Sequence, residues 1–252
     1  MEKKYTDAVL FSGGLDSTVT LAECMATSAV PLLIFCNHGF RSSERERRAV
    51  QNLARHYSVA FKEVTISLPT YAHVMRQGGC YIYYEYGKSG KPSKTGVPPF
   101  VIPYRNYAFI SMALMYCGVY NVHKLWLGFD YYVGKGCSED KSPAFVKQFQ
   151  KLVDVGKERG TDVTFITPLQ GMRKAQIIEQ GRFRKIPFKL TWTCYNDLRL
   201  PCGICNACVG RQRAFCSLGQ RDPLIYASRK MLMSNYTKQA LTVYDRVHNE
   251  FY

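Results

Sequence analysis

"VLFSGGLDST", residues 9–18, joins a short apolar run to two glycines and a cluster of small polar residues around an aspartate. An apolar run without alternation is typical of a strand that is buried on both faces of a parallel sheet. The residues that follow, 17–27, have the pattern of a helix. In doubly wound sheets the turn between the first strand and the first helix often binds the ligand, so this stretch predicts both the fold class and the place of the site.

Strand-like and helix-like segments alternate along most of the chain. Further strands are expected at residues 29–39, 60–68, 124–129 and 163–169. Further helices are expected at residues 42–57, 105–120 and 142–160, the last of them closed by Gly160. Strict alternation of this kind predicts an α/β fold with a doubly wound, mostly parallel sheet and right-handed crossovers.

The length of 252 residues suffices for one domain with a small appendage. We expect a main domain at residues 1–190 and, packed on it, a cysteine-containing segment with a basic helical tail at 191–252. Segment 76–99, rich in Gly, Pro, Lys and Tyr, is predicted to be a lid or binding loop. The N-terminus lacks a signal-peptide cleavage site, and no apolar run approaches the roughly 20 residues that cross a bilayer. A cytoplasmic protein without membrane contact is therefore expected.

The formal net charge is +15 at pH 7. One interpretation is a generally basic surface that keeps the protein in solution. The other is attraction to an anionic partner, either a nucleic acid or an acidic protein. The basic residues are spread along much of the chain, which favours broad electrostatic attraction over a dedicated basic tail.

Four of the ten cysteines lie in one short segment, "CYNDLRLPCGICNAC", residues 194–208. Cys194, Cys202, Cys205 and Cys208 supply four thiolates, the ligand set of a closed tetrahedral zinc site. A closed site keeps no open position for water, so the predicted role is structural. An iron–sulfur cluster is the alternative.

The turn at residues 11–18 has the composition of a phosphate-binding loop. Its glycines allow backbone N–H groups to approach a phosphate, and the N-terminus of the following helix attracts anions. The turn has neither the lysine of a Walker sequence nor the spacing G-x-G-x-x-G. It therefore has to rely on backbone donors, on the hydroxyls of Ser12 and Ser17, and on Mg²⁺ near Asp16.

"SGGLDS", residues 12–17, resembles the S-G-G-x-D-S loop of the ATP pyrophosphatases, which cleave ATP between the α and β phosphates and adenylate a substrate oxygen. Together with "LTWTCYNDLRLPCGICNACVGRQRAF", residues 190–215, it is similar to the QueC family of 7-cyano-7-deazaguanine synthases. The resemblance implies an adenine nucleotide alpha hydrolase-like fold and one structural zinc. It also implies a ligase that uses ATP, Mg²⁺ and ammonia to convert 7-carboxy-7-deazaguanine to its nitrile through the amide, releasing AMP and pyrophosphate.

The resemblance also implies roles for individual residues. "PFVIPYRN", residues 99–106, is similar to the family's F-V-P-G-R-N, and "TPLQGMRKAQI", residues 167–177, to its T-P-L-x-x-x-x-K-A-E. Nucleotide contacts are implied for Phe11, Ser12, Gly13, Gly14, Leu15, Asp16, Ser17 and Thr18. Catalytic roles are implied for Asp16, Ser17, Lys174 and Arg105. Substrate contacts are implied for Arg105, Asn106, Asp130 and Asp140.

The chain departs from the family where the family has D-F/Y-S-G-Y-P-D-C-R. In "GFDYYVGKGCSEDKSPAF", residues 128–145, Asp140 takes the final acidic position, but Lys141 and Ser142 replace the Cys and Arg. Tyr104 also replaces a glycine. Three alternatives stay open: transfer of the activated deazaguanine to a macromolecular amine, an ATP pyrophosphatase that modifies RNA directly, and a binding protein with an inactive site. We also expect a homodimer.

Overall fold

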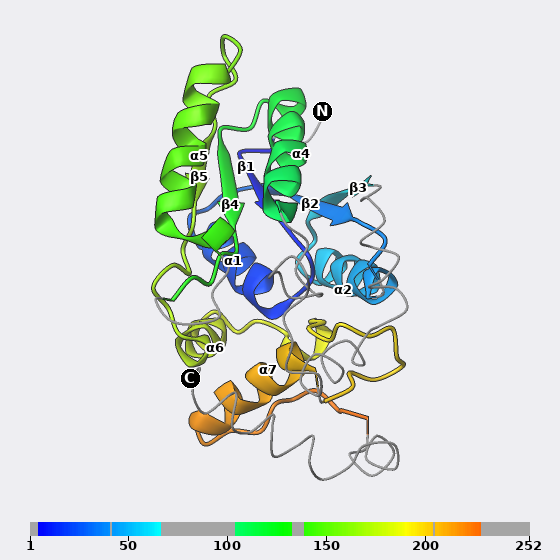
Figure 1. Ribbon diagram of the computed structural model, residues 1–252. Helices are drawn as coiled ribbons and strands as arrows, with labels where there is room; N and C mark the ends of the chain where they lie inside the picture. The colour runs from blue at the N-terminus through cyan, green and yellow to red at the C-terminus, as the bar shows by residue number, and fades with distance from the viewer. Residues whose placement is uncertain (1–4, 41, 67–103, 133–138, 204, 228–252) are drawn as a thin grey trace, which may run out of the picture.

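Five parallel strands form the central sheet of the computed structural model, in the order β3-β2-β1-β4-β5 (Figure 1). The structure describes residues 5–40, 42–66, 104–132, 139–203 and 205–227. The strands are β1 (Asp7–Leu10), β2 (Pro31–Asn37), β3 (Ala60–Thr65), β4 (Lys124–Leu127) and β5 (Thr164–Ile166). Every pairing between them is parallel, so the prediction of a doubly wound parallel sheet is confirmed.

The winding direction of the sheet changes at β1. On one side β1 pairs with β2, where Val9 lies opposite Leu33, and on the other with β4, where Val9 lies opposite Trp126. The chain adds β2 and β3 on the first side and then returns to add β4 and β5 on the second. Such a switch point leaves a crevice beyond the carboxyl ends of the two central strands, where α/β proteins bind ligands.

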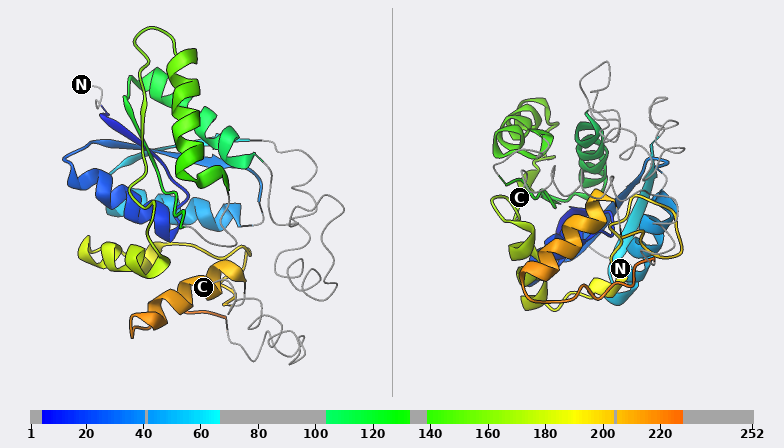
Figure 2. Two further views of the ribbon diagram at one scale, coloured as in Figure 1. Left: turned by 60° about the vertical axis from the view of Figure 1, so that its left-hand side comes forward. Right: turned by 60° about the horizontal axis from the view of Figure 1, so that its bottom comes forward.

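Helices cover both faces of the sheet (Figure 2). The helices on one face are α1 (Leu15–Ala26) and α2 (Ser43–His56), and those on the other are α4 (Arg105–Tyr120) and α5 (Pro143–Gly156). Leu53 of α2 packs in a buried cluster with Leu33 of β2. Ile110 of α4 packs in a second cluster with Leu125 of β4. The central strands β1, β2 and β4 are thus largely buried, as expected of strands covered on both faces.

A third layer lies against α1 on the side away from the sheet (Figure 1). It contains α6 (Lys174–Phe183), α7 (Asn206–Ser217) and the short 3-10 helix η2 (Phe188–Leu190); a second 3-10 helix, η1 (Glu139–Lys141), precedes α5. Val19 of α1 shares a buried cluster with Ile177 of α6 and Phe215 of α7. The buried guanidinium of Arg211 in α7 forms an ion pair of 2.8 Å with Asp222. The domain boundary near residue 190 stays a prediction.

One helix is shorter than its sequence pattern indicates. The expectation that the helix beginning at residue 142 runs to Gly160 is wrong, because α5 ends at Gly156 and Lys157 takes an extended backbone. Thr161 N–H then bonds to the Glu158 carbonyl in a separate turn. Segment 76–99 and the part of the predicted tail beyond residue 227 lie outside the described residues. No helix in the described part of the chain combines the length and apolar character needed to cross a bilayer.

Candidate functional site

The residues after β1 form a tight loop that leads into α1. Gly13 has a φ of +71°, and a Cβ there would lie 2.9 Å from both the Ala49 Cβ and the Val50 nitrogen, so glycine is required. The carbonyl of Gly14, the residue before α1, accepts a hydrogen bond from the Thr18 hydroxyl at 2.7 Å. The first N–H groups of a helix have no partners within it, so this end of α1 can bind an anion.

The remaining loop residues either anchor the loop or carry hydroxyl groups. Phe11 and Leu15 are buried, and the Phe11 N–H donates to the Ile34 carbonyl of β2 at 2.8 Å. Ser12 Oγ lies 3.3 Å from Ser17 Oγ. We call residues 11–18 the phosphate loop, because they offer backbone and hydroxyl donors around one helix N-terminus.

Four charged side chains form a continuous ionic cluster at the switch point between β1 and β4. The Lys174 amine, at the start of α6, donates to both carboxylate oxygens of Asp16 at 2.7 and 2.8 Å. It also donates to Asp130 Oδ2, beyond the end of β4, at 2.7 Å. The Lys141 amine donates to the other oxygen, Asp130 Oδ1, at 2.8 Å. Charged groups from α1, from the segment after β4, from η1 and from α6 thus meet at one end of the sheet.

Contacts within the ionic cluster and burial shift the pKa values of Asp130, Lys174 and Asp16. Removal from bulk water alone would raise the pKa of Asp130, but the amines of Lys174 and Lys141 hold it well below its usual range. Burial would lower the pKa of the Lys174 amine, and the two carboxylates raise it instead. Burial raises the pKa of Asp16, and Lys174 opposes that effect. Lys174 therefore stays a cation beside the phosphate loop at neutral pH.

A second group of side chains lies around the start of α4. Arg105, the first residue of α4, has its guanidinium carbon 5.8 Å from the centre of the Phe109 ring. His38, just after β2, contacts Phe109 edge-on at 5.2 Å and stacks on Phe40 at 5.6 Å. Tyr195 meets Phe40 edge-on at 6.3 Å. We call these five residues the aromatic group; it presents flat faces and one guanidinium, which suits a planar anionic heterocycle.

The His38 imidazole is buried, with 6% of the residue exposed. Burial and the nearby charge of Arg105 lower the pKa of His38 to about 4, from an ordinary value of 6.5. The folded protein therefore keeps His38 neutral between these two values, whereas the unfolded chain binds a proton. This contribution to stability is complete above pH 6.5 and is lost as the pH falls towards 4.

We expect the free energy of unfolding of His38→Gln to fall less than that of the wild type as the pH is lowered from 7 to 4. The lowered pKa of His38 makes the wild type lose about 3 kcal/mol of unfolding free energy between pH 7 and pH 4. The variant lacks the imidazole and should not show this loss. Urea unfolding at pH 7.5 and at pH 4.5 measures the free energy of unfolding of both proteins. His56→Gln, at an exposed position of α2, is the control and should follow the wild type. Equal losses of stability between pH 7.5 and pH 4.5 in the wild type and in His38→Gln would contradict the lowered pKa of His38.

The four clustered cysteines form a buried group that could hold a metal ion. Their sulfur atoms all lie within 4.8 Å of one another, and Cys202 Sγ is 4.0 Å from Cys208 Sγ. Sulfurs of a tetrahedral zinc site, with bonds of about 2.3 Å, are separated by about 3.8 Å, so the donor set and its spacing fit. The N–H of Cys202 lies 3.3 Å from Cys194 Sγ, and the N–H of Cys205 lies 3.3 Å from Cys202 Sγ. Such donors stabilise thiolates.

The cysteine segment is attached directly to the phosphate loop. The N–H of Trp192 donates to the Gly13 carbonyl at 2.9 Å, and its indole N–H donates to the Cys194 carbonyl at 2.8 Å. The guanidinium of Arg45 in α2 lies over the Trp192 ring at 5.8 Å and forms an ion pair of 3.0 Å with Asp197. The segment therefore supports the backbone of the phosphate loop.

The structure places the predicted site residues in two neighbouring groups. Asp16, Asp130 and Lys174 are joined in the ionic cluster, and Arg105 lies in the aromatic group with Asn106 buried beside it in the chain. Asp140 lies in η1 next to Lys141, and the Lys141 amine is the one that contacts Asp130. Asp140 and the other roles implied by resemblance stay predictions.

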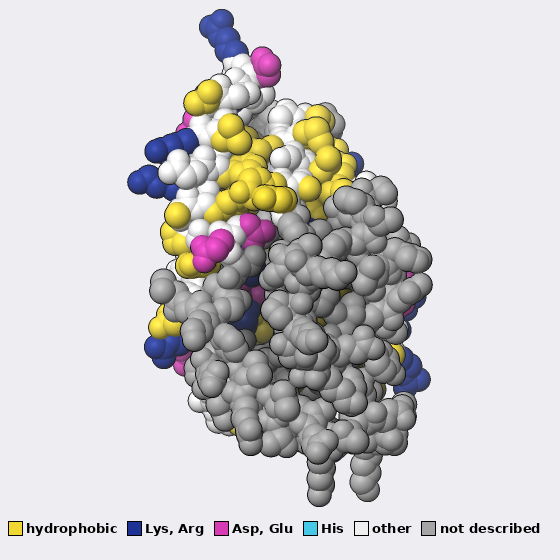
Figure 3. All heavy atoms as spheres, viewed as in Figure 1, with side chains coloured by type: hydrophobic (Ala, Val, Ile, Leu, Met, Phe, Trp, Pro, Cys, Tyr) yellow, Lys and Arg dark blue, Asp and Glu magenta, His cyan; other side chains and the backbone are white. Residues whose placement is uncertain are grey.

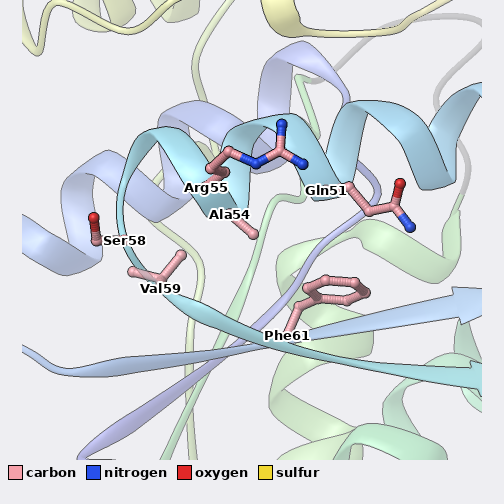
Figure 4. Close-up of a pocket in the computed structure, with 6 residues that line it drawn as sticks. All are labelled: Gln51, Ala54, Arg55, Ser58, Val59 and Phe61. Carbon is pink, nitrogen blue, oxygen red and sulfur yellow. The ribbon is translucent and has the colours of Figure 1, made fainter.

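The sequence alone does not single out Lys141, Phe40 or Tyr195 as site residues. A basic residue at position 141 was a visible signal, because it stands where the family pattern has a cysteine. The aromatic residues gave no such signal. A surface hollow elsewhere, between α2 and β3, is lined by Gln51, Ala54, Arg55, Ser58, Val59 and Phe61 (Figure 4). None of the predicted site residues lines that hollow.

Comparison with known proteins identifies relatives along most of the chain. The family model of "Queuosine biosynthesis protein QueC" matches residues 7–219. A 7-cyano-7-deazaguanine synthase of Chlorobium phaeovibrioides is 32% identical over 230 residues, covering 88% of this chain and 96% of that protein. A protein of the same name from Methanospirillum hungatei is 28% identical over 218 residues, covering 86% and 97%.

Among solved structures, NMN synthetase from Francisella tularensis aligns with 98% of this chain and 87% of its own, at a TM-score of 0.43 and 13% identity. That likeness is too distant to support an argument. The match to the family model, in contrast, covers most of the chain, including β1, the ionic cluster and all four clustered cysteines. The chain therefore belongs to the QueC family.

Proposed function

We propose that this chain is an ATP-dependent ligase that converts 7-carboxy-7-deazaguanine to 7-cyano-7-deazaguanine. The observation that carries the proposal is the ionic cluster, in which Lys174 joins the phosphate-loop Asp16 to Asp130 beyond β4. It places acidic and basic groups at the N-terminus of α1, in a chain whose relatives are named for this product. The reaction needs such a site, because a carboxylate is a poor electrophile until it is activated.

The chemistry proceeds in two activations. A carboxylate oxygen attacks the α-phosphorus of ATP, pyrophosphate leaves, and an acyl adenylate forms. Ammonia attacks its carbonyl carbon, and AMP and a proton leave, giving the amide. The amide oxygen then attacks a second ATP and again expels pyrophosphate. Loss of AMP and of the remaining nitrogen-bound protons completes the carbon–nitrogen triple bond.

The residues of the phosphate loop and the ionic cluster have distinct roles in this proposal. Backbone N–H groups of Gly13, Gly14 and Leu15 and the hydroxyls of Ser12, Ser17 and Thr18 bind phosphate oxygens, and Phe11 anchors the loop. Mg²⁺, which prefers oxygen ligands, would be held by the Asp16 carboxylate and would neutralise phosphate charge. Lys174 supplies a fixed cation beside it. Preorganised charges of this kind stabilise the charge that develops on the leaving group.

The aromatic group is the proposed place for the deazaguanine. Arg105 would bind the substrate carboxylate, and Asn106, Asp130 and Asp140 would contact the polar edges of the ring system. Support comes from the flat ring faces of Phe40 and Tyr195 beside Arg105. Burial raises the pKa of the Tyr195 phenol to about 12, and the charges of Arg105 and Lys174 oppose that effect.

The four clustered cysteines are proposed to hold one structural zinc ion. Four buried sulfur ligands complete a tetrahedral shell and leave no position for a reacting water molecule. The chemistry that the ion supplies is cross-linking of the segment around it. Through Trp192 that cross-link stabilises the phosphate loop, so the ion affects nucleotide binding without contacting the nucleotide.

Further partners also belong to the proposal. A homodimer is supported by exposed apolar side chains of α4 and α5, Met115, Val119, Leu152 and Val155, in the region where Figure 3 shows hydrophobic side chains gathered. The net charge of +15 supports an additional nucleic acid or acidic protein partner. A cytoplasmic location suits the cysteines outside the proposed zinc site, Cys24, Cys36, Cys117 and Cys216, which form no disulfide among the described residues.

The function is tested by incubating the purified protein with ATP, Mg²⁺, ammonium and 7-carboxy-7-deazaguanine. Mass spectrometry should show loss of the acid, transient amide and accumulation of the nitrile, with AMP and pyrophosphate. Omission of ammonium should stop product formation. Release of ADP and phosphate, or an unchanged acid, would contradict the proposal.

A further inference from the structure

Lys141 differs from Lys174 in how its hydrogen-bond capacity is used. A lysine ammonium has three N–H donors. Lys174 directs its donors to Asp16 Oδ1, Asp16 Oδ2 and Asp130 Oδ2. In the described part of the chain the Lys141 amine has one acceptor, Asp130 Oδ1, and its side chain is 33% exposed. Lys141 is therefore the cation of the ionic cluster with donors left for a ligand.

The backbone of Lys141 is held in place from both sides. Its carbonyl accepts a hydrogen bond from Gln170 Nε2 at 3.2 Å. The next residue, Ser142, is the N-cap of α5 and accepts the Phe145 N–H at 3.1 Å. Lys141 thus lies at a fixed junction between η1 and α5, unlike a lysine on a free surface. A fixed cation needs little reorganisation when a ligand arrives.

The position of Lys141 in the ionic cluster indicates what kind of ligand its amine can bind. Lys141 and Lys174 bind the two oxygens of one carboxylate, and Lys174 also binds Asp16 of the phosphate loop. The four charges of the cluster sum to zero, so the cluster alone does not attract a polyphosphate. A ligand with several negative oxygens can use the two Lys141 donors that have no acceptor among the described residues, without breaking the pair with Asp130.

The geometry points to Lys141 as a catalytic residue that contacts the pyrophosphate leaving group of ATP. This assignment rests on the proposed function insofar as that function uses ATP. As the bond between the α-phosphorus and the bridging oxygen breaks, negative charge grows on the departing pyrophosphate, and the ammonium of Lys141 stabilises it. No proton is transferred in this step; Mg²⁺ would neutralise part of the charge on the departing pyrophosphate.

Binding of magnesium pyrophosphate tests the assignment without any deazaguanine. Calorimetry should give a dissociation constant about tenfold weaker for Lys141→Gln than for the wild type, with recovery in Lys141→Arg. Lys147→Gln, at an exposed position of α5, is the matched control and should bind as the wild type does. If Lys141→Gln does not fold, as judged by circular dichroism, Lys141→Met, which keeps the side-chain length, replaces it.

Turnover kinetics distinguish a contact between Lys141 and pyrophosphate from a contact with the carboxylate substrate and from a purely structural role. At saturating ATP, kcat of Lys141→Gln should fall by about 10–100-fold, while KM for the carboxylate and the thermal midpoint stay unchanged. Unchanged pyrophosphate affinity, or a rise in KM for the carboxylate alone, would overturn the assignment. If the wild type binds pyrophosphate through Lys141 but does not convert 7-carboxy-7-deazaguanine, the proposed function fails and the assignment of Lys141 stands.

Discussion

Asp16→Asn is expected to lower AMP and pyrophosphate release by about 10³-fold while the protein stays folded. Asp16 is the acidic residue in the first turn of α1, and both of its oxygens contact the Lys174 amine at 2.7 and 2.8 Å. The amide keeps the shape of the side chain but loses the charge that orients Lys174 and would hold Mg²⁺. Chromatographic measurement of AMP at saturating substrates gives the rate.

The fold should survive this change for a structural reason. Lys174 keeps its second partner, Asp130, at 2.7 Å, and the Asp16 side chain is 29% exposed, so no buried charge is left without a partner. The thermal midpoint of Asp16→Asn should therefore lie close to that of the wild type. Glu179→Gln, at an exposed position of α6, is the matched control and should keep full activity. Activity within a fewfold of wild type in Asp16→Asn would remove Asp16 from the mechanism.

Cys205→Ser is expected to abolish metal binding and to yield little folded protein. The four sulfurs lie within 4.8 Å of one another in a group that is buried throughout. A structural zinc contributes about 10–16 kcal/mol in small zinc-binding peptides, which is as large as the whole stability of a typical domain, about 5–15 kcal/mol. Elemental analysis should give one zinc per wild-type chain, and the yield of soluble variant should fall sharply.

Cys216→Ser provides the control for the cysteine prediction. Cys216 lies in the same helix, α7, but is exposed, so its replacement should change neither zinc content nor yield. Where folded Cys205→Ser can be recovered, its ATP affinity should also be lower, because the segment donates to the Gly13 carbonyl through Trp192. An iron-containing wild type, or a metal-free variant with normal stability and normal ATP affinity, would contradict a structural zinc.

Much of the fold could be predicted because its signals are local. β1 and β2 are short, mostly apolar runs that are largely buried, and each is followed by a helix. The glycines of the phosphate loop also have a local cause, since Gly13 takes a positive φ against α2. The cysteine cluster follows from close sequence spacing, which limits where the sulfurs can lie.

The rest of the site depends on contacts between distant parts of the chain. Lys141 pairs with Asp130, 11 positions earlier in the chain. The charge of Arg105 acts on His38, after β2, and on Tyr195, after Cys194. The bond from Trp192 to Gly13 joins residues nearly 180 positions apart and uses backbone atoms, which carry no side-chain signal. Local patterns specify which groups are available, and the strand order decides which of them meet.

The transfer of oxygen from substrate to AMP tests the central claim, adenylation of the substrate carboxylate, most directly. The enzyme is supplied with 7-carboxy-7-deazaguanine that carries ¹⁸O at both carboxylate oxygens, with unlabelled ATP, Mg²⁺ and ammonium. Mass spectrometry of the nucleotide products should show ¹⁸O in the phosphate of AMP, with both labelled oxygens recovered in AMP once the nitrile has formed. Label found in inorganic phosphate or water, with unlabelled AMP or with ADP, would contradict the account.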